Sequence, residues 1–548
     1  MTTSSHFGFA RLLAPTALVA LSALAPAQTP FNIGHAGLVY PTTYPTSPKF
    51  DREADVAYDA TTGNYLVAWE VKTELYTPSG QTFIRDAYSI RFQRVNSFGL
   101  LLGSTVDIAN PFLDRSRPRV ANLNQTNQFL IVWEQSSNNG DIYGCTVDAA
   151  SGAFSAPVPI ANTSALEDQA AVAGEATTFD NDALVVWRNQ SASQIRGSEV
   201  SAAGPGVPPS VMPSVSVAFG SNVRQPSIAA AGDLAGRLLV AWAEDDGSRG
   251  EIWGRLMDRS ATFLNSAFPI YEGRDAARPA VTGEGTLWVV AFQHREVASA
   301  NFDIAAQVVR FDPVAREEYL IGGTSTVEAT PGQNETRPSV AWLGESVVVN
   351  WQEANGAVSH IRGKTIDPHS CLRCQPGFAV DNGTTATWPA IASEMTSQLG
   401  SLSNGSLQVF TQDNLVCGAL FRGKDGLVID VGGGCGQGGL PDATCAVSPN
   451  VAFRLRVLHS QPNQPAVLFL SAGRIDAPLT PTCTLIPDPL LGVVLTSLTS
   501  ARGNTSQPVR IPDNPALVGA RVFVQWAIAG GSGYLGFDLS NTLSVRIG

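Results

Sequence analysis

The stretch that decides the fold is residues 117–144, RPRVANLNQTNQFLIVWEQSSNNGDIYG. It contains three elements in order: Pro118-x-Val120-Ala121, an apolar run that ends at Trp133, and Ile142-x-Gly144. The apolar run is hydrophobic at successive positions, which is typical of a strand buried on both faces. The Ser- and Asn-rich segment after it is typical of a hairpin turn. The stretch therefore predicts antiparallel strands joined by short turns.

The same unit recurs seven times along the 548 residues. Its first element, a small residue or proline followed two positions later by Val or Ile, is centred on Val56, Val120, Val172, Ile228, Val281, Val340 and Ile391. Its second element ends at an aromatic residue: Trp69, Trp133, Trp187, Trp242, Phe292, Trp351 or Phe410. Three to four antiparallel strands per unit, repeated at intervals of 51 to 64 residues, predict an all-β fold with a seven-bladed β-propeller. We expect the aromatic residue to fill the space between adjacent blades.

The repeat pattern ends at a glycine-rich stretch that follows Asp430. Strand-like runs then occur at 451–458, 466–470, 491–495, 520–528 and 543–547, separated by Pro, Gly and Asn turns. About 100 residues of this kind predict a small C-terminal β-sandwich. The expected organisation is a signal peptide over residues 1–27, a propeller over 28–431, a glycine-rich linker over 432–440 and a β-sandwich over 441–548.

The N-terminal segment predicts export. It has one charged residue, Arg11, then an apolar run from Leu12 to Leu24 and a small-residue cleavage pattern that ends at Ala27. No later segment approaches the roughly 20 apolar residues that a transmembrane helix needs. Asp and Glu number 47 against 35 Lys and Arg, which argues against a nucleic acid partner. We therefore expect a secreted or cell-surface protein whose partner is an extracellular glycan or protein.

Two parts of the sequence resemble known proteins. The Arg-Pro-x-Val-Ala, Leu-Val-x-Trp and Ile-x-Gly repeats, clearest at 117–144 and 337–363, resemble those of predicted secreted β-propeller proteins of environmental bacteria. The tail, with Gln525-Trp526 and a segment from Ser540 to Leu543, resembles a C-terminal domain common in exported proteins of the same kind. The resemblance covers nearly the whole mature chain. It implies secretion by a bacterium, a propeller and an appended sandwich, and it supplies no catalytic residue.

One position in each repeat is a candidate ligand-binding position. The residue before each first strand's Pro or Ala is Glu53, Arg117, Gln169, Gln225, Arg278, Arg337 or Trp388, and we call this set the axial ring. Seven-fold repetition would place these side chains around one axial opening, where they could hold an anionic or sugar ligand. The alternative, which we favour, is that they bridge neighbouring blades by hydrogen bonds.

Motifs for catalysis are missing from the sequence. It has no sialidase Asp-box, no Gly-x-Ser-x-Gly elbow and no phosphate-binding glycine loop. Acidic residues follow the aromatic residue at Glu70, Glu134, Glu244 and Glu353, and a pair of them could hydrolyse a glycosidic bond. We interpret their recurrence as a shared structural role, such as capping a hairpin.

Metal ligation is likewise not indicated by a specific motif. His294 and His360, in adjacent repeats, are the pair that a metal or acid–base centre could use. The segments 180–182 and 245–247 offer oxygen ligands for calcium, but neither matches the full EF-hand loop. We therefore predict no cofactor and interpret both segments as solvated turns.

The seven cysteines are an odd number for an exported protein, so they cannot all pair within one chain. Cys371 and Cys374 have zinc-ligand spacing without a second pair, and we expect them in a disulfide. Cys445 and Cys483 are the predicted disulfide of the tail, with Cys435 as a competitor. That leaves Cys145 and Cys417, in the third strands of two repeats, as the best candidates for unpaired, buried thiols.

The sequence favours a noncatalytic extracellular binding or interaction protein whose ligand it does not identify. A polysaccharide-active hydrolase or lyase, with its site at the mouth of the axial channel, is the alternative, and a structural envelope protein is a third reading. Propellers host many functions, so the fold does not choose between them. Two carboxylates, or the two histidines with an acid, converging in one concave pocket would favour the enzyme.

Overall fold

The computed structural model describes residues 30–34 and 46–547, apart from gaps at 77–82, 109–112, 137–139, 175–180, 232–235, 246–249, 274, 297–300, 313–316, 344–345, 369–376, 382–384, 395–404, 423–427, 431–434, 436–439, 445–451, 459, 481–482, 491, 502, 513 and 518–519. The predicted signal peptide lies outside the described residues. Strands dominate these ranges, with short 3-10 helices η1 (Asn124–Thr126) and η2 (Pro515–Leu517). Within them, no helix has the length and apolar character needed to cross a membrane.

The described residues up to Arg422 form seven antiparallel sheets of four or five strands, which we number in chain order. The first holds β2 (Thr46–Asp59), β3 (Asn64–Tyr76), β4 (Phe83–Asn96) and β5 (Leu101–Ile108), and the second holds β6 (Arg115–Leu123), β7 (Gln128–Gln135), β8 (Asp141–Asp148) and β9 (Val158–Ala161). The third holds β10 (Glu167–Gly174), β11 (Asp182–Asn189), β12 (Gln194–Ser201), β13 (Ser210–Val211) and β14 (Val215–Phe219), and the fourth holds β15 (Arg224–Ala230), β16 (Arg237–Asp245), β17 (Gly250–Asp258) and β18 (Phe268–Tyr271).

The next three sheets repeat the pattern. The fifth holds β19 (Ala277–Glu284), β20 (Leu287–His294), β21 (Asp303–Asp312) and β22 (Glu317–Glu328), and the sixth holds β23 (Asn334–Leu343), β24 (Ser346–Asn355), β25 (Val358–Ile366) and β26 (Phe378–Ala379). The seventh joins β27 (Ala386–Ser393), β28 (Gly405–Gln412) and β29 (Leu415–Arg422) with β1 (Phe31–Asn32). Each sheet thus begins with the first element of one sequence repeat and continues with its apolar run.

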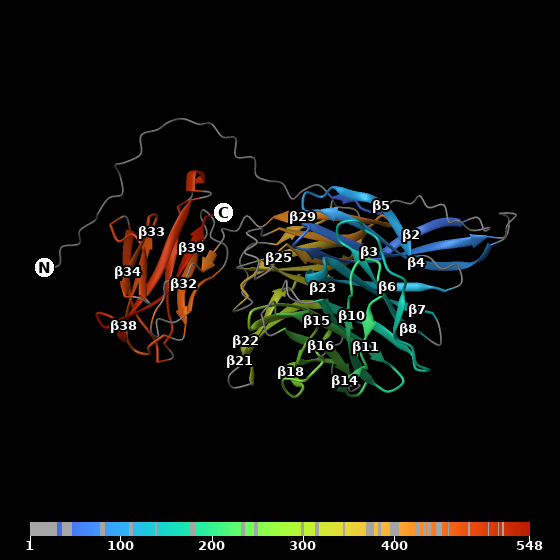
Figure 1. Ribbon diagram of the computed structural model, residues 1–548, viewed down its shortest axis with the longest axis horizontal. Coiled ribbons are helices and arrows are strands. Elements are labelled where there is room, and N and C mark those ends of the chain that lie inside the picture. The colour runs from blue at the N-terminus through green and yellow to red at the C-terminus, as the bar shows by residue number, and fades with distance from the viewer. Residues whose placement is uncertain are drawn as a thin grey trace.

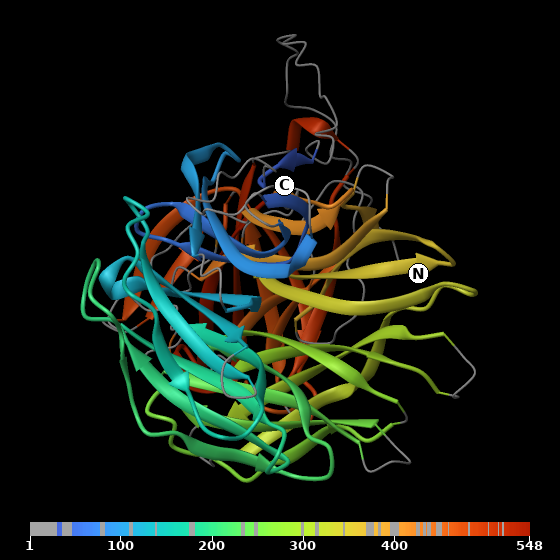
Figure 2. The ribbon, with the colours of Figure 1, turned by 90° about the vertical axis from the view of Figure 1, so that its right-hand side faces the viewer.

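The first strands of these sheets contact one another in a closed cycle, β2 to β6, β10, β15, β19, β23, β27 and back to β2. Figure 2 shows the colours of the chain passing in order around this body. The N-terminal strand β1 pairs with β29, with Phe31 opposite Gly418 and Asn32 opposite Cys417. Residues from the two ends of the repeat region therefore share one sheet. The arrangement is consistent with a β-propeller.

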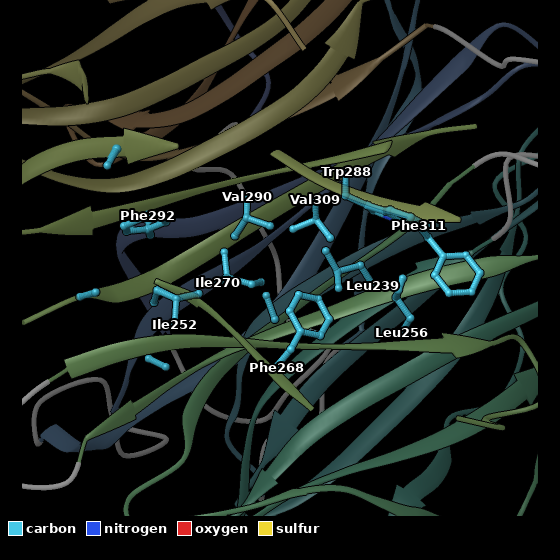
Figure 3. Packing of buried hydrophobic residues seen from close by; sticks show 14 of the residues in the cluster. Leu239, Ile252, Leu256, Phe268, Ile270, Trp288, Val290, Phe292, Val309 and Phe311 are labelled. Atoms are coloured by element: carbon cyan, nitrogen blue, oxygen red, sulfur yellow. The ribbon is translucent and has the colours of Figure 1, made fainter. Parts of the chain in front are cut away.

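The cores lie between neighbouring sheets. In one cluster, Leu239 and Leu256 of the fourth sheet pack against Trp288, Phe292 and other residues of the fifth (Figure 3). The aromatic residues predicted to fill such spaces are all at most 2% exposed: Trp69, Trp133, Trp187, Trp242, Phe292, Trp351 and Phe410. Each belongs to a cluster that also contains residues of an adjacent sheet. The prediction that these rings are buried between sheets is confirmed.

The chain after Arg422 forms a second group of strands, drawn in orange to red in Figure 1. Its larger sheet has the order β30 (Val428–Asp430), β39 (Phe537–Arg546), β38 (Arg521–Tyr534), β33 (Pro465–Ser471) and β36 (Gly492–Leu498). Smaller sheets pair β31 (Leu440–Thr444), β32 (Ala452–Leu458) and β37 (Thr505–Arg510), and β34 (Arg474–Thr480) with β35 (Cys483–Pro487). A core around Trp526 joins residues of β32, β33, β38 and β39.

The tail sheet begins earlier in the chain than the sequence suggested. Strand β30 precedes the glycine-rich stretch 432–440, yet Ile429 pairs with Ser544 of β39. The glycine-rich residues therefore connect two strands that both belong to the tail. A three-residue strand carries too little periodicity to be assigned from sequence.

Candidate functional site

A β-bulge interrupts the first strand of every repeat at the predicted axial ring. In the second sheet, for example, the pairing of β6 with β7 shifts between Ser116 and Arg119, so that Arg117 and Pro118 are left out of the ladder. A proline fits there because its missing N–H is not needed for pairing. The axial ring residues all adopt left-handed backbone conformations, with φ between 49° and 60°: Glu53, Arg117, Gln169, Gln225, Arg278, Arg337 and Trp388.

All seven ring residues line a single cavity of about 440 Å³. The sequence prediction that the repeat would bring them around one opening is therefore met by the geometry. Asp55 and Arg119 also line the cavity and were not predicted. Both occupy the variable position between the Pro or Ala and the Val or Ile of the first strand, so the repeat pattern itself marks the position.

Part of the axial ring is held by hydrogen bonds between neighbouring sheets. The backbone N–H of Gln225 donates to Oε1 of Gln169 at 2.6 Å, and the backbone N–H of Arg278 donates to Oε1 of Gln225 at 2.9 Å. Each bond joins one bulge to the side chain of the preceding bulge. For these two glutamines the interpretation that we favoured, bridging between sheets, is correct.

The acidic residues after the aromatic serve the same purpose in two sheets. Glu70 accepts a hydrogen bond from the backbone N–H of Arg117 at 3.3 Å, and Glu134 accepts one from that of Gln169 at 2.7 Å. Glu244 and Glu353 sit one residue further from their aromatic and bond elsewhere, Glu353 to Arg362 at 3.1 Å. The prediction of one structural role shared by all four, such as capping a hairpin, is therefore wrong, because Glu70 and Glu134 join adjacent sheets whereas Glu353 bonds within its own sheet.

Two arginines of the cavity have acidic neighbours. The Arg117 guanidinium lies 3.7 Å from Glu53 and 3.2 Å from Glu134. Burial lowers the pKa of Arg117, but Glu134 and Glu53 outweigh this effect and leave the pKa raised. The charge of Arg119 lowers the pKa of Asp55, but burial of the carboxyl group has the larger effect and leaves that pKa raised. Arg117 is therefore paired with carboxylates within the wall of the cavity, and Arg119 has Asp55 as its acidic neighbour.

The other two arginines lack such partners. In the described part of the chain, no hydrogen bond or ion pair holds the side chains of Arg278, Arg337 or Trp388, which we call the open arc. The Arg337 guanidinium instead lies over the Trp388 ring, 3.2 Å from its centroid. Burial, with the nearby charge of Arg278, lowers the pKa of Arg337 to about 9, and burial also lowers that of Arg278. The charge of Glu53 opposes this lowering at both arginines, but within the described residues no carboxylate forms an ion pair with either guanidinium.

The carboxylates of the cavity are committed to structure. Asp55 accepts a hydrogen bond from the backbone N–H of Val120 at 2.9 Å, which joins the first and second sheets. Glu134 accepts from Gln169 and Arg117, as described above, and burial raises its pKa. A general acid and its partner carboxylate need free oxygens on either side of a sugar. The arrangement here leaves these oxygens facing protein donors.

The two candidate histidines do not line the cavity. Nδ1 of His294 lies 3.3 Å from the hydroxyl of Tyr271, and burial lowers the pKa of this imidazole. Nδ1 of His360 lies 3.4 Å from Asp381 in the sixth sheet. Each histidine therefore has its contacts within a different part of the fold from the ring, and the structure does not bring the pair into the axial site.

The described residues contain no group of three or more His, Cys, Asp or Glu that could hold a metal ion. Asp180, the first residue of one predicted calcium-ligand segment, and residues 246–247 of the other lie outside the described residues. The absence of a cofactor stays a prediction.

The cysteine predictions have mixed outcomes. Cys145 and Cys417 are free and buried, as expected. Cys371, Cys374 and Cys445 lie outside the described residues, as does the side chain of Cys483, so the pairings 371–374 and 445–483 stay predictions. Cys435 is disulfide-bonded. Because its partner must be one of those four, the two predicted pairs cannot both form in one molecule.

No protein-family model and no curated protein sequence matches the chain. Its fold is similar to a protein of unknown function from Dyadobacter fermentans (10% identity, 69% of this chain and 99% of that one, TM-score 0.39). It is also similar to the β-propeller domain of the Trilobed protease from Pyrococcus furiosus (6%, 68% and 96%, 0.37) and to hydrazine synthase from Kuenenia stuttgartiensis (9%, 67% and 94%, 0.42). At these identities and scores the likenesses carry no inference about function.

Proposed function

We propose that this chain is an exported, noncatalytic binding protein whose ligand occupies the axial cavity. In this proposal the seven sheets are the blades of one propeller, and the tail is a β-sandwich that serves as an accessory or surface-attachment module. The predicted signal peptide supports export to the extracellular space, where a glycan or a protein would be the partner.

The observation that carries the proposal is the residue type at the bulges. A left-handed backbone costs a residue with a side chain roughly 1–2 kcal/mol, and glycine is the usual solution. The chain has 51 glycines, yet all seven ring positions hold residues with long or large side chains. Strain retained at positions that share one cavity supports a function for those side chains. Hydrogen bonds between sheets explain why glutamines occupy two of these positions. No such bonds explain the side chains of the open arc.

Binding is favoured over catalysis by the contacts of the acidic groups. The carboxylates of Asp55 and Glu134 accept backbone hydrogen bonds across sheets, and Glu53 faces Arg117. The histidines lie away from the cavity. The axial site thus presents cationic and aromatic groups, which suit recognition, rather than a free acid and base, which hydrolysis requires.

The test is a glycan array and a polysaccharide-degradation screen run side by side on the chain lacking residues 1–27. We expect binding without release of soluble sugars. Trp388→Ala, which removes a wall of the cavity, should abolish the binding that the array finds. Trp253→Ala, on the third strand of the fourth sheet, is the matched control and should leave it unchanged. Binding that survives Trp388→Ala would contradict the axial location, and release of sugars would favour the enzyme.

A further inference from the structure

We propose that the axial cavity binds the oxyanion of an acidic sugar, a carboxylate or a sulfate, between the guanidinium groups of Arg278 and Arg337. This inference rests on the proposed function, since it names the class of ligand for the same cavity. It places the anion against the open arc, on the side of the cavity formed by the fifth, sixth and seventh sheets.

The charge of the cavity differs in sign from that of the whole chain. Over the full sequence, acidic residues outnumber basic ones by 47 to 35. Among the residues that line the cavity, four arginines stand against three carboxylates, Glu53, Asp55 and Glu134. Low dielectric inside a cavity strengthens the field of such charges. An anionic ligand is therefore attracted to the axial opening although the protein as a whole carries negative charge.

The excess positive charge is located at Arg278 and Arg337. The printed ion pairs and hydrogen bonds of Glu53, Asp55 and Glu134 go to Arg117 or to a backbone N–H, and the charge of Glu53 acts on Arg278 and Arg337 only from beyond contact distance. Arg278 and Arg337 lie close enough to repel each other and to be repelled by Arg117 and Arg119. Two like charges held together with no carboxylate in contact are an unfavourable arrangement that a bound anion would relieve. The pair is therefore a ready-made anion site.

The geometry of the arc also suits an oxyanion attached to a sugar. All the cations in the wall are arginines, whose planar forks of N–H donors match carboxylate and sulfate oxygens. Stacking on Trp388 uses the face of the Arg337 guanidinium and leaves its in-plane donors for a ligand. The half-buried indole beside the charge offers apolar surface to a sugar ring. One residue thus orients the cation and contributes to the contact area.

The test is isothermal titration calorimetry at constant ionic strength with glucuronate, glucose 6-sulfate, inorganic sulfate and glucose as separate probes. We expect glucuronate or glucose 6-sulfate to bind more tightly than glucose, and the comparison with inorganic sulfate shows how much the sugar contributes. Arg278→Gln and Arg337→Gln should each weaken the acidic sugars by roughly 10-fold or more, since each removes a charge-assisted hydrogen bond. Arg295→Gln, at the residue that follows β20 and outside the cavity wall, is the control and should bind as the wild type does.

Arg278→Lys with Arg337→Lys keeps the charges but not the forks, and we expect it to bind acidic sugars with intermediate affinity. Unchanged circular dichroism and denaturation midpoints at or above that of the control would show that the variants are folded. If glucose binds as tightly as glucuronate and the arginine variants have no effect, the oxyanion inference fails while binding in the cavity stands. If none of the four probes binds, the oxyanion inference fails as well, and the array result alone then decides the proposed function.

Discussion

The hydrogen bonds along the axial ring make a quantitative prediction for Gln225. Replacing it with alanine removes the Oε1 that accepts from the Arg278 backbone N–H at 2.9 Å and keeps the left-handed backbone with φ of 52°. An unsatisfied buried donor costs about 1–3 kcal/mol, so we expect Gln225→Ala to lower the free energy of unfolding by about that amount. Gln225→Gly loses the same bond but relieves about 1 kcal/mol of backbone strain, and should be the more stable of the two.

Gln293 provides the matched control because its Oε1 accepts the equivalent bond, from Arg337 N–H at 3.2 Å. It lies within strand β20 and has no left-handed backbone among the described residues. Gln293→Ala should therefore cost about as much as Gln225→Ala, while Gln293→Gly should cost about 0.5–1 kcal/mol more than the alanine variant. The assay is urea unfolding followed by tryptophan fluorescence. The same order of glycine and alanine at both positions would refute the reasoning.

Three further predictions concern a charge, a thiol and a strand. Arg337→Gln should raise the denaturation midpoint at pH 7 by the equivalent of about 1 kcal/mol, because it removes a buried cation repelled by Arg278. The pKa of Arg337 in the folded protein, about 9, lies below its pKa in the unfolded chain, so the wild type gains stability as the pH rises above 9. The difference in midpoint between the variant and the wild type should therefore shrink above pH 9. Burial raises the pKa of the Cys145 thiol to about 12, so iodoacetamide at pH 8 should leave it unmodified in the native protein and label it in denaturant. Ile33→Ala, which truncates a side chain 1% exposed in the core shared by the first and seventh sheets, should cost about 2–4 kcal/mol in urea unfolding, and a midpoint equal to that of the wild type would argue against β1 as a structural strand.

Much of the repeat region could be predicted because the same physical requirement recurs in each unit. A strand buried on both faces needs consecutive apolar residues, and Leu184 to Trp187 shows this in the sequence as clearly as in the structure. The position of Arg117 before Pro118 was enough to place it on the cavity, since a repeated position on a first strand must face a common centre. Periodicity thus identified the strands and the ring.

The sequence could not predict which residues of the axial ring have ion-pair partners and which do not. Arg117 and Arg337 occupy equivalent positions in the sequence pattern, but Glu53 and Glu134 flank only the first of them. That difference depends on which side chains lie on either side in space. The left-handed bulge was hidden for a related reason, since the residue type that usually marks it, glycine, is absent from all seven positions. The two-residue strand β1 is too short to carry any pattern.

The pairing of Phe31 and Asn32 with β29 has a consequence for how the protein folds. Asn32 and Cys417 are 385 positions apart in the chain, and closing a loop of that length costs about 5 kcal/mol of chain entropy by itself. Six sheets can assemble from local segments in the order of synthesis, but β1, which is synthesised first, must wait for its partner β29 in the last sheet. The early strand is therefore an open edge throughout translation, exposed to mispairing until the final repeat arrives.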